Sequence, residues 1–354
     1  MRRDHLVITF LAAILVVSTI PGGPAGVADA AIIQPSFTRY AGPAGLPDVQ
    51  WAGEPSVGVN WNTNVANGGT VMYQAYRATY RVTFDDATSP PTATWENAKS
   101  PYSIINVDPI AAVDHVTGRT FAGGLDGACS VLSYSDNDGA SWTPMGNSCA
   151  GAAWDHPTIG SGPWAGGKPL NALYDRVVYY CAQLSVAQCA VSSDGGLTFG
   201  AGINVPCGYI NPGLHGSVHV GSNGWAYLPF LDCGGNSGVA VTKDNGLTWQ
   251  SRPITNAKTP GDGFDPDVAT TTSGWAYVAY PTADWGVGVA LTKDGGATWT
   301  NFGDVAAAAG IRSSTFHEMV AGDDDRAAVV YLGSTTDGKP HASSFNGVWH
   351  TYVT

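Results

Sequence analysis

Charged side chains are scarce in this chain. Only 12% of its 354 residues are Asp, Glu, Lys or Arg, and only six are lysine. Basic residues number 16 against 28 acidic ones, which gives a formal net charge of -12. This deficit of positive charge disfavours non-specific binding to nucleic acid or to an anionic membrane. Glutamate is rarer still: Glu54, Glu96 and Glu318 are the only three, so the place of each can be followed through the fold.

Long apolar runs are absent after residue 20, although 44% of the chain is hydrophobic. The apolar run at 6–20 follows two arginines and is too short to be a comfortable membrane span. Small residues at Ala28-Asp29-Ala30 offer a cleavage site. Residues 1–30 are therefore predicted to be a signal peptide, with a retained membrane anchor as the alternative. We expect a secreted, extracellular chain that begins near Ala31, makes no membrane contact and is a monomer.

Helix-forming composition is also lacking, because the chain holds 46 Gly and 22 Pro, nearly a fifth of its length. With 10% aromatic residues, this excludes both a helical bundle and a disordered chain. Six cysteines, an even number in an exported chain, predict three disulfides, for which fifteen connectivities are possible. We expect nearest neighbours to pair: Cys129 with Cys149, Cys181 with Cys189, and Cys207 with Cys233.

One short pattern occurs four times. Each copy has a Ser or Thr, an Asp or Asn two residues later, a Gly, and an aromatic residue that opens the next apolar stretch. The copies are SDNDGASW at 135–142, SSDGGLTF at 192–199, TKDNGLTW at 242–249 and TKDGGATW at 292–299. This is the chemistry of a tight hairpin turn, in which the Asp or Asn side chain accepts backbone N–H groups and the Gly allows positive φ.

A second series of motifs counts the repeats independently. Six segments recur every 47 to 60 residues: Glu54-Pro55, Asp108-Pro109, Asp155-His156-Pro157, His215-Gly216, Asp265-Pro266-Asp267 and His317-Glu318. Each precedes a turn and a β-rich run, so each opens the first strand of a four-stranded antiparallel unit of about fifty residues. The four repeated turns then lie between third and fourth strands. The sequence predicts an all-β, six-bladed β-propeller, a single domain over 31–354.

The last unit ends at Thr354 without a fourth strand. The segment Ile32 to Tyr40 precedes the first unit and has no other partner, so we expect it to supply that strand and close the ring, since an uncovered edge would leave backbone groups unpaired. A C-terminally truncated sequence is the alternative.

Because strand direction alternates, the six motifs open the innermost strands on the face opposite the repeated turns. Acids and imidazoles gathered there can hold one protonated and one ionised group side by side. The predicted catalytic residues are Glu54, Asp155, His156, His215, His317 and Glu318, with Glu54 and Glu318 sharing a pocket between the first and last blades. The predicted substrate-binding residues are Arg77, Arg312, Tyr209, Asp108 and Asp267. No cofactor is expected. Histidine and carboxylate ligands would suit zinc or calcium, but no short-spacing metal motif is present.

The four repeated turns resemble the Asp-box of the sialidase (BNR-repeat) superfamily, whose members are six-bladed propellers. The resemblance implies hydrolysis of a glycoside, with three arginines that hold the sugar carboxylate, a Tyr activated by Glu, and an acid/base Asp. The motif that carries the first arginine in the family corresponds here to Ala52-Gly53-Glu54-Pro55, and Arg77 and Arg312 are the remaining candidates.

The implied function is a secreted, sialidase-like glycoside hydrolase of exo-α-sialidase type that acts on an acidic glycan, so a carbohydrate is the expected partner. Two alternatives stay open. One is a non-catalytic propeller that binds glycans or proteins. It is favoured because Ala52-Gly53-Glu54-Pro55 lacks the arginine that the family carries at this motif. The other is a polysaccharide lyase, in which His215 or His156 would act with Tyr209.

Overall fold

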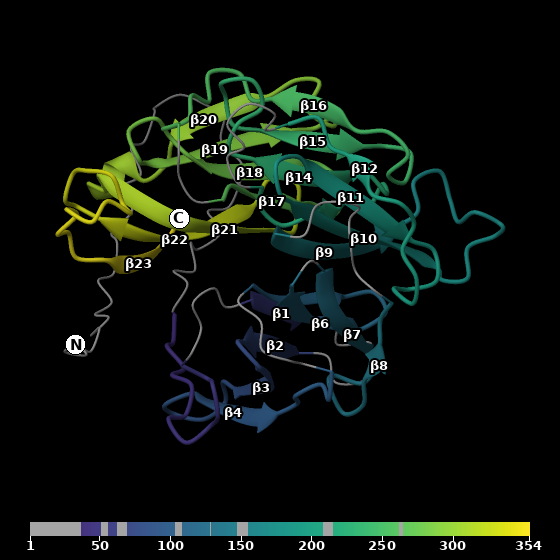
Figure 1. Ribbon diagram of the computed structural model, residues 1–354. Helices are drawn as coiled ribbons and strands as arrows, with labels where there is room; N and C mark the ends of the chain where they lie inside the picture. Colours follow the sequence, from purple (N-terminus) through teal and green to yellow (C-terminus); the bar gives the residue numbers. More distant parts are fainter. Residues whose placement is uncertain are drawn as a thin grey trace, which may run out of the picture.

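Six antiparallel sheets follow one another along the chain (Figure 1). The structure is a computed structural model that describes residues 37–50, 56–61, 69–102, 108–127, 129–146, 155–207, 215–261 and 265–354. In these residues the only helix is one short 3-10 turn, Ala307–Ala309. The chain is a six-bladed β-propeller, as the repeats predict.

The strands of each blade are numbered in chain order. Blade 1 holds β1 (Ser56–Asn60), β2 (Thr70–Ala75), β3 (Ala78–Asp85) and β4 (Thr92–Asn97), and blade 2 holds β5 (Pro109–Asp114), β6 (Arg119–Asp126), β7 (Cys129–Ser135) and β8 (Thr143–Pro144). Blade 3 holds β9 (Asp155–Pro163), β10 (Arg176–Gln183), β11 (Ala187–Ser192) and β12 (Ile203–Asn204), and blade 4 holds β13 (His219–Val220), β14 (Ala226–Phe230), β15 (Gly238–Thr242) and β16 (Gln250–Pro253). Blade 5 holds β17 (Asp267–Thr270), β18 (Ala276–Pro281), β19 (Val287–Thr292) and β20 (Thr300–Asp304), and blade 6 holds β21 (Ser313–Ala321), β22 (Ala327–Ser334) and β23 (His350–Val353).

The first strand of each blade is the innermost one. Innermost strands of successive blades contact one another in the order β1, β5, β9, β13, β17 and β21. In Figure 1 the strands β1, β9, β17 and β21 accordingly lie nearest the middle of the view. The predicted second strands of all six units are confirmed, as β2, β6, β10, β14, β18 and β22.

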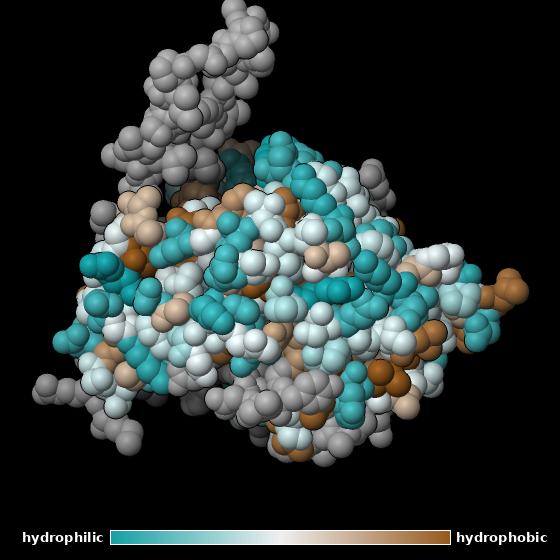
Figure 2. Space-filling model, turned by 90° about the horizontal axis from the view of Figure 1, so that it is seen from above, coloured by the Kyte–Doolittle hydropathy of each residue, from teal (hydrophilic) through white to brown (hydrophobic). Residues whose placement is uncertain are grey.

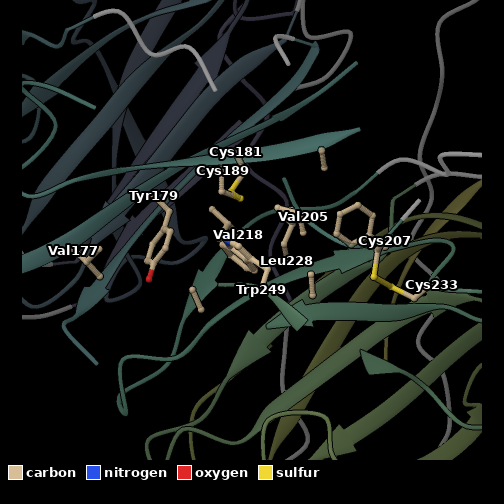
Figure 3. Close-up of a cluster of buried hydrophobic side chains, with 14 of the residues drawn as sticks. Val177, Tyr179, Cys181, Cys189, Val205, Cys207, Val218, Leu228, Cys233 and Trp249 are labelled. Carbon is tan, nitrogen blue, oxygen red and sulfur yellow. A yellow bond between two sulfur atoms is a disulfide. The ribbon is translucent and has the colours of Figure 1, made fainter. Parts of the chain in front are cut away.

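The hydrophobic core is divided among the spaces between neighbouring blades. One cluster joins blade 3 to blade 4 through Tyr179, Leu228 and Trp249 (Figure 3), and similar clusters join blades 2 and 3, blades 4 and 5, and blades 5 and 6. Burying apolar surface on both sides of each sheet holds the blades in a fixed order, and the innermost strands are thereby fixed around the axis.

Two disulfides border the cluster between blades 3 and 4. Cys181 is bonded to Cys189 across the β10–β11 hairpin, and Cys207 is bonded to Cys233, as Figure 3 shows. Both predicted pairings are confirmed. Cys129 is also disulfide-bonded, but Cys149, its predicted partner, lies outside the described residues. Disulfides form and persist in oxidising compartments, so these bonds are consistent with an extracellular protein.

The four repeated turns have the hydrogen bonds that their sequences predict. In blade 5, Thr298 donates its backbone N–H to Asp294 Oδ1 over 2.9 Å, and Gly296 N–H donates to Thr292 Oγ1 over 2.7 Å. The turns at 192–199 and 242–249 repeat both bonds, and Asn137 takes the place of the aspartate in blade 2. The turns therefore act as structural links between the third and fourth strands.

Residues 41–50 cover one face of blade 1. Val49 packs with Tyr80, and the Tyr73 hydroxyl donates a hydrogen bond of 3.2 Å to the Val49 carbonyl. The opposite face of the same sheet carries Arg81, which donates to the Asp138 carbonyl of blade 2. The segment thus lies on the face of blade 1 that is directed away from blade 2. The sequence gives no sign of this role, because the segment carries no repeat motif.

Blade 6 has three strands among the described residues, in the order β21-β22-β23. Residues 37–40 of the expected closing strand are not in a β-strand, and Tyr40 instead contacts Phe84 of blade 1 with ring centroids 4.9 Å apart. Residues 32–36 lie outside the described residues, as does the predicted signal peptide. Closure of blade 6 by the N-terminal segment therefore stays a prediction.

The visible surface mixes polar and weakly polar residues, with apolar ones scattered among them (Figure 2). The loop between β9 and β10 projects from blade 3 and carries the exposed Leu170 and Leu173. In the part of the chain that the structure describes, no helix has the length and apolar character needed to cross a membrane.

Candidate functional site

Polar residues from four blades meet at the axis. The residues that the structure connects to one another are His156 of blade 3, His215 of blade 4, Asp265 and Asp267 of blade 5, and Glu318 of blade 6. In blade 5, Asp267 pairs with Ala279 at one end of the sheet, while Thr292, which begins a repeated turn, pairs with Ala276 at the other. The cluster therefore lies on the face opposite the repeated turns, as the strand order predicts.

The imidazole of His156 contacts the carboxyl group of Asp265 between blades 3 and 5. The distance from His156 Nε2 to Asp265 Oδ2 is 2.7 Å, and the side chains are 24% and 32% exposed. Both side chains are therefore partly exposed to solvent. Asp265 Oδ1 is buried and has no hydrogen-bond partner among the described residues.

His215 stands behind this pair. Its ring is fully buried and lies edge-to-face against His156 with centroids 5.1 Å apart. Burial, followed by the neighbouring His156, lowers the pKa of His215 to about 3, so the imidazole is neutral at physiological pH. Nδ1 lies 2.9 Å from the Gly216 carbonyl, which can only accept, so Nδ1 carries the proton. His215 therefore supports His156 and does not reach the channel surface.

The backbone at His156 is strained. Its φ is 53°, in the left-handed region, and the pairing of β9 with β10 shifts register between Cys181 and Gln183. The innermost strand of blade 6 repeats the arrangement, with Phe316 at φ 53° and a register shift between Thr315 and Glu318. Bulges with non-glycine residues at positive φ redirect side chains and cluster at functional sites. Here they adjoin His156 and Glu318.

Asp267 is the buried acid of the cluster, with only 4% of its surface exposed. Its Oδ2 accepts a hydrogen bond of 2.8 Å from the backbone N–H of Met319, which ties the start of blade 5 to blade 6. Gly216 allows the preceding blade to approach equally closely, because a Cβ there would lie 1.8 Å from the Pro266 carbonyl oxygen. Burial, with a smaller contribution from the charge of Asp265, raises the pKa of Asp267 to about 7.

Glu318 keeps access to solvent although protein atoms surround it on most sides. This partial desolvation, and then the charges of Asp267 and Asp265, raise the pKa of Glu318 to about 8. Glu318 and Asp267 compete for protons while Asp265 is paired with His156. The cluster thus holds two carboxyl groups, Asp267 and Glu318, whose pKa values lie near neutral pH.

The strand around Glu318 begins earlier than expected. The sequence pattern places His317 and Glu318 at the start of the innermost strand, whereas β21 begins at Ser313. The difference arises because Ser313, Ser314 and Thr315 continue the ladder with β22 beyond the bulge. Glu318 therefore lies in the middle of β21 and not at its start.

His317 points into the protein rather than toward the channel. It is 2% exposed, and burial lowers the pKa of His317 to about 4. The Ser314 hydroxyl donates to the Trp285 carbonyl, so it accepts its bond from the N–H of His317 Nε2. His317 therefore fixes the local structure between blades 5 and 6.

The two predicted arginines differ in availability. Arg77 makes two hydrogen bonds to Asp48, of 3.1 Å and 3.2 Å, and is occupied by the segment that covers blade 1. Arg312 is exposed directly before β21, and within the described ranges its guanidinium makes no ion pair. Asp155 is exposed and Asp108 is half-buried, and no contact of either with the cluster is seen.

Glu54 and Tyr209 lie outside the described residues, so the predicted pocket between Glu54 and Glu318 stays a prediction. Asp265 is a site residue that the sequence prediction omits. The spacing Asp-Pro-Asp could have indicated it, because the first carboxylate precedes the strand and the second lies within it. In the described part of the chain, no group of three or more His, Cys, Asp or Glu side chains is placed to hold a metal ion.

No family model matches this chain, and no curated protein matches it. Among solved structures, the GH74 enzyme of Niastella koreensis is 17% identical with a TM-score of 0.45, and the match covers 84% of this chain and 36% of that one. The chain thus spans about a third of that enzyme. An α-L-arabinofuranosidase from Fusarium graminearum is 13% identical over 85% of this chain and 92% of its own, with a TM-score of 0.48. A six-bladed lectin from Aleuria aurantia is 14% identical over 79% and 87%, with a TM-score of 0.48. None of the three is similar enough to assign a function.

Proposed function

We propose that this chain is a secreted glycoside hydrolase whose active site is the axis cluster of blades 3 to 6. The observation that carries the proposal is that Glu318, a solvent-accessible carboxyl with a raised pKa, lies near enough to Asp265 to feel its charge, while Asp265 contacts His156. Hydrolysis of a glycosidic bond needs one carboxyl group that gives a proton and one that is ionised. Environments that separate two carboxyl groups in this way are the usual mark of an acid/base pair.

Glu318 is the proposed general acid. Its proton moves to the glycosidic oxygen as the bond between that oxygen and the sugar carbon breaks. Asp265 is the proposed partner: its partly exposed carboxylate stabilises the positive charge that develops on the sugar and accepts a proton from the attacking water. The water oxygen then bonds to the sugar carbon, and solvent returns the proton from Asp265 to Glu318. His156 orients Asp265, and buried His215 supports His156.

An acidic glycan of sialidase type is the proposed substrate class, and Arg312 is its proposed carboxylate ligand. Arg312 is exposed on the site face and unpaired within the described ranges, and one guanidinium suits one carboxylate. Arg77 would first have to leave Asp48. Glycan binding without turnover is the second candidate function. It is favoured because Arg77, already paired with Asp48, is not free to hold a substrate carboxylate. A lyase that uses His215 as base is disfavoured, because His215 is fully buried.

The test is turnover of fluorogenic glycosides of sialic acid and of neutral sugars by wild type, Glu318→Gln and Glu96→Gln. Glu96 is the matched control, since it is ion-paired to Arg81 on the outer strand of blade 1. Removing a general acid costs about 10²-fold or more in rate. We expect that loss for Glu318→Gln and none for Glu96→Gln. Equal turnover by both variants would place the active site elsewhere, and glycan binding with no turnover would favour the second candidate.

A further inference from the structure

Two loops meet on the site face beside the cluster. Residues 282–286 join β18 to β19 of blade 5, and residues 335–349 join β22 to β23 of blade 6. They touch through Trp285 and His341, whose rings are edge-to-face with centroids 5.4 Å apart and an interplanar angle of 80°. Both loops leave their blades at the end where β17 and β21 begin. The aromatic pair therefore lies on the same face as Glu318.

The backbone of Trp285 is held from several sides. Its N–H donates to the Thr282 carbonyl over 2.9 Å, and its carbonyl accepts a bond of 2.8 Å from the Ser314 hydroxyl. Its φ is 64°, a left-handed conformation that costs free energy for a residue with a side chain. The indole nevertheless stays partly exposed. This well-anchored turn therefore holds a partly exposed aromatic ring in a fixed position on the site face.

Ser314 links this turn to the proposed acid. It precedes Glu318 by four residues on β21, and because of the bulge at Phe316 this step matches only three residues of β22, or roughly 10 Å of strand. A glycan of two or three sugar units spans that length. The exposed carboxylates of Asp284 and Asp337 flank the pair on the same two loops and can accept hydrogen bonds from sugar hydroxyls.

We infer that Trp285, bordered by His341, is a stacking subsite for a neutral pyranose unit of the glycan whose scissile bond lies at Glu318. This inference rests on the proposed function, which supplies the position of the bond. One face of a pyranose ring presents C–H groups that carry partial positive charge, and these pack against the negative face of an indole. Such an aromatic surface with a few polar groups is the usual composition of a ligand site.

The experiment measures binding rather than turnover. Glu318→Gln, alone and combined with Trp285→Ala, is titrated by calorimetry with cellotetraose, xylotetraose, chitotetraose and 3′-sialyllactose, and with the monosaccharides of each. Trp61→Ala is the matched control, because Trp61 is also a tryptophan in ring contact with a histidine, His115, and is more exposed than Trp285, but it follows β1 at the opposite end of its strand. Trp285→Phe, which keeps a ring, guards against a folding defect.

We expect Trp285→Ala to weaken the tightest-bound oligosaccharide by about tenfold, Trp285→Phe to weaken it less, and Trp61→Ala to leave it unchanged. Monosaccharide binding should not depend on Trp285. Equal binding with and without the indole, or binding of none of the four oligosaccharides, overturns the subsite whatever the turnover. Binding that depends on Trp285 in a protein without turnover supports the subsite and refutes the hydrolase.

Discussion

Replacing Asp267 by Asn should make the protein more stable at alkaline pH and leave it unchanged at acidic pH. Asn has nearly the shape of a protonated Asp and can still accept the Met319 N–H bond. In the folded chain the pKa of Asp267 is raised from 3.8 to about 7. The folded state therefore holds a proton that the unfolded state has lost, and stability falls as pH rises through this window.

The size of the effect follows from the shift. Three pKa units correspond to about 4 kcal/mol, and relaxation and water entry reduce this to about 2 kcal/mol. For a domain of this length the change amounts to about 4 °C in the melting temperature. We expect the melting temperature of Asp267→Asn to equal that of wild type only at pH values below 3.8, where both states hold the proton, and to exceed it by about this amount at pH 8.5.

The assay is scanning calorimetry of wild type, Asp267→Asn and Asp294→Asn across this pH range. Asp294 is the control of opposite sign, because hydrogen bonds led by that from the Thr298 hydroxyl lower the pKa of Asp294 to about 2. Its loss should lower stability at neutral pH, and the difference should shrink only as pH falls toward 2. A melting-temperature difference for Asp267→Asn that does not grow between pH 5 and 8.5 would refute the argument that burial governs this carboxyl.

Two further predictions concern the frame that holds the site. Replacing Cys207 and Cys233 together by Ser should lower the free energy of unfolding by about 3 kcal/mol, and more than the same change at Cys181 and Cys189, because the first bond closes 26 residues and the second only 8. Chemical denaturation measures the loss in free energy of unfolding for each double variant. A larger loss for the Cys181 and Cys189 variant would contradict chain entropy as the main cause. Deleting residues 32–36 should lower the melting temperature if they close blade 6, and an unchanged melting temperature would reject closure by this segment.

Local repetition made the fold readable from the sequence. Four turns with the same hydrogen bonds and six motifs at one period specify six similar sheets, since each turn is built from side chains within eight residues. The disulfide between Cys181 and Cys189 could be placed for the same reason, because it crosses a single hairpin. Strand direction alone put His156, Asp267 and Glu318 on one face.

The rest of the site depends on contacts that the period does not encode. The bulges at His156 and Phe316 set where these strands point their side chains, and neither is visible as a motif. His215 and His317 were selected by residue type, yet packing between blades buries both. Likewise, the ion pair between Asp48 and Arg77 could not be predicted, because Asp48 belongs to a segment that carries no repeat motif.

The central claim is that the channel holds a carboxyl, Glu318, that keeps its proton at neutral pH. Its most direct test is a ¹³C NMR titration of protein labelled at the glutamate carboxyl carbons, which is tractable because the chain has three glutamates and Glu318→Gln assigns one of them. We predict that the Glu318 resonance titrates at about pH 8. Titration of all three resonances near the ordinary glutamate value of about 4.3 would contradict the claim.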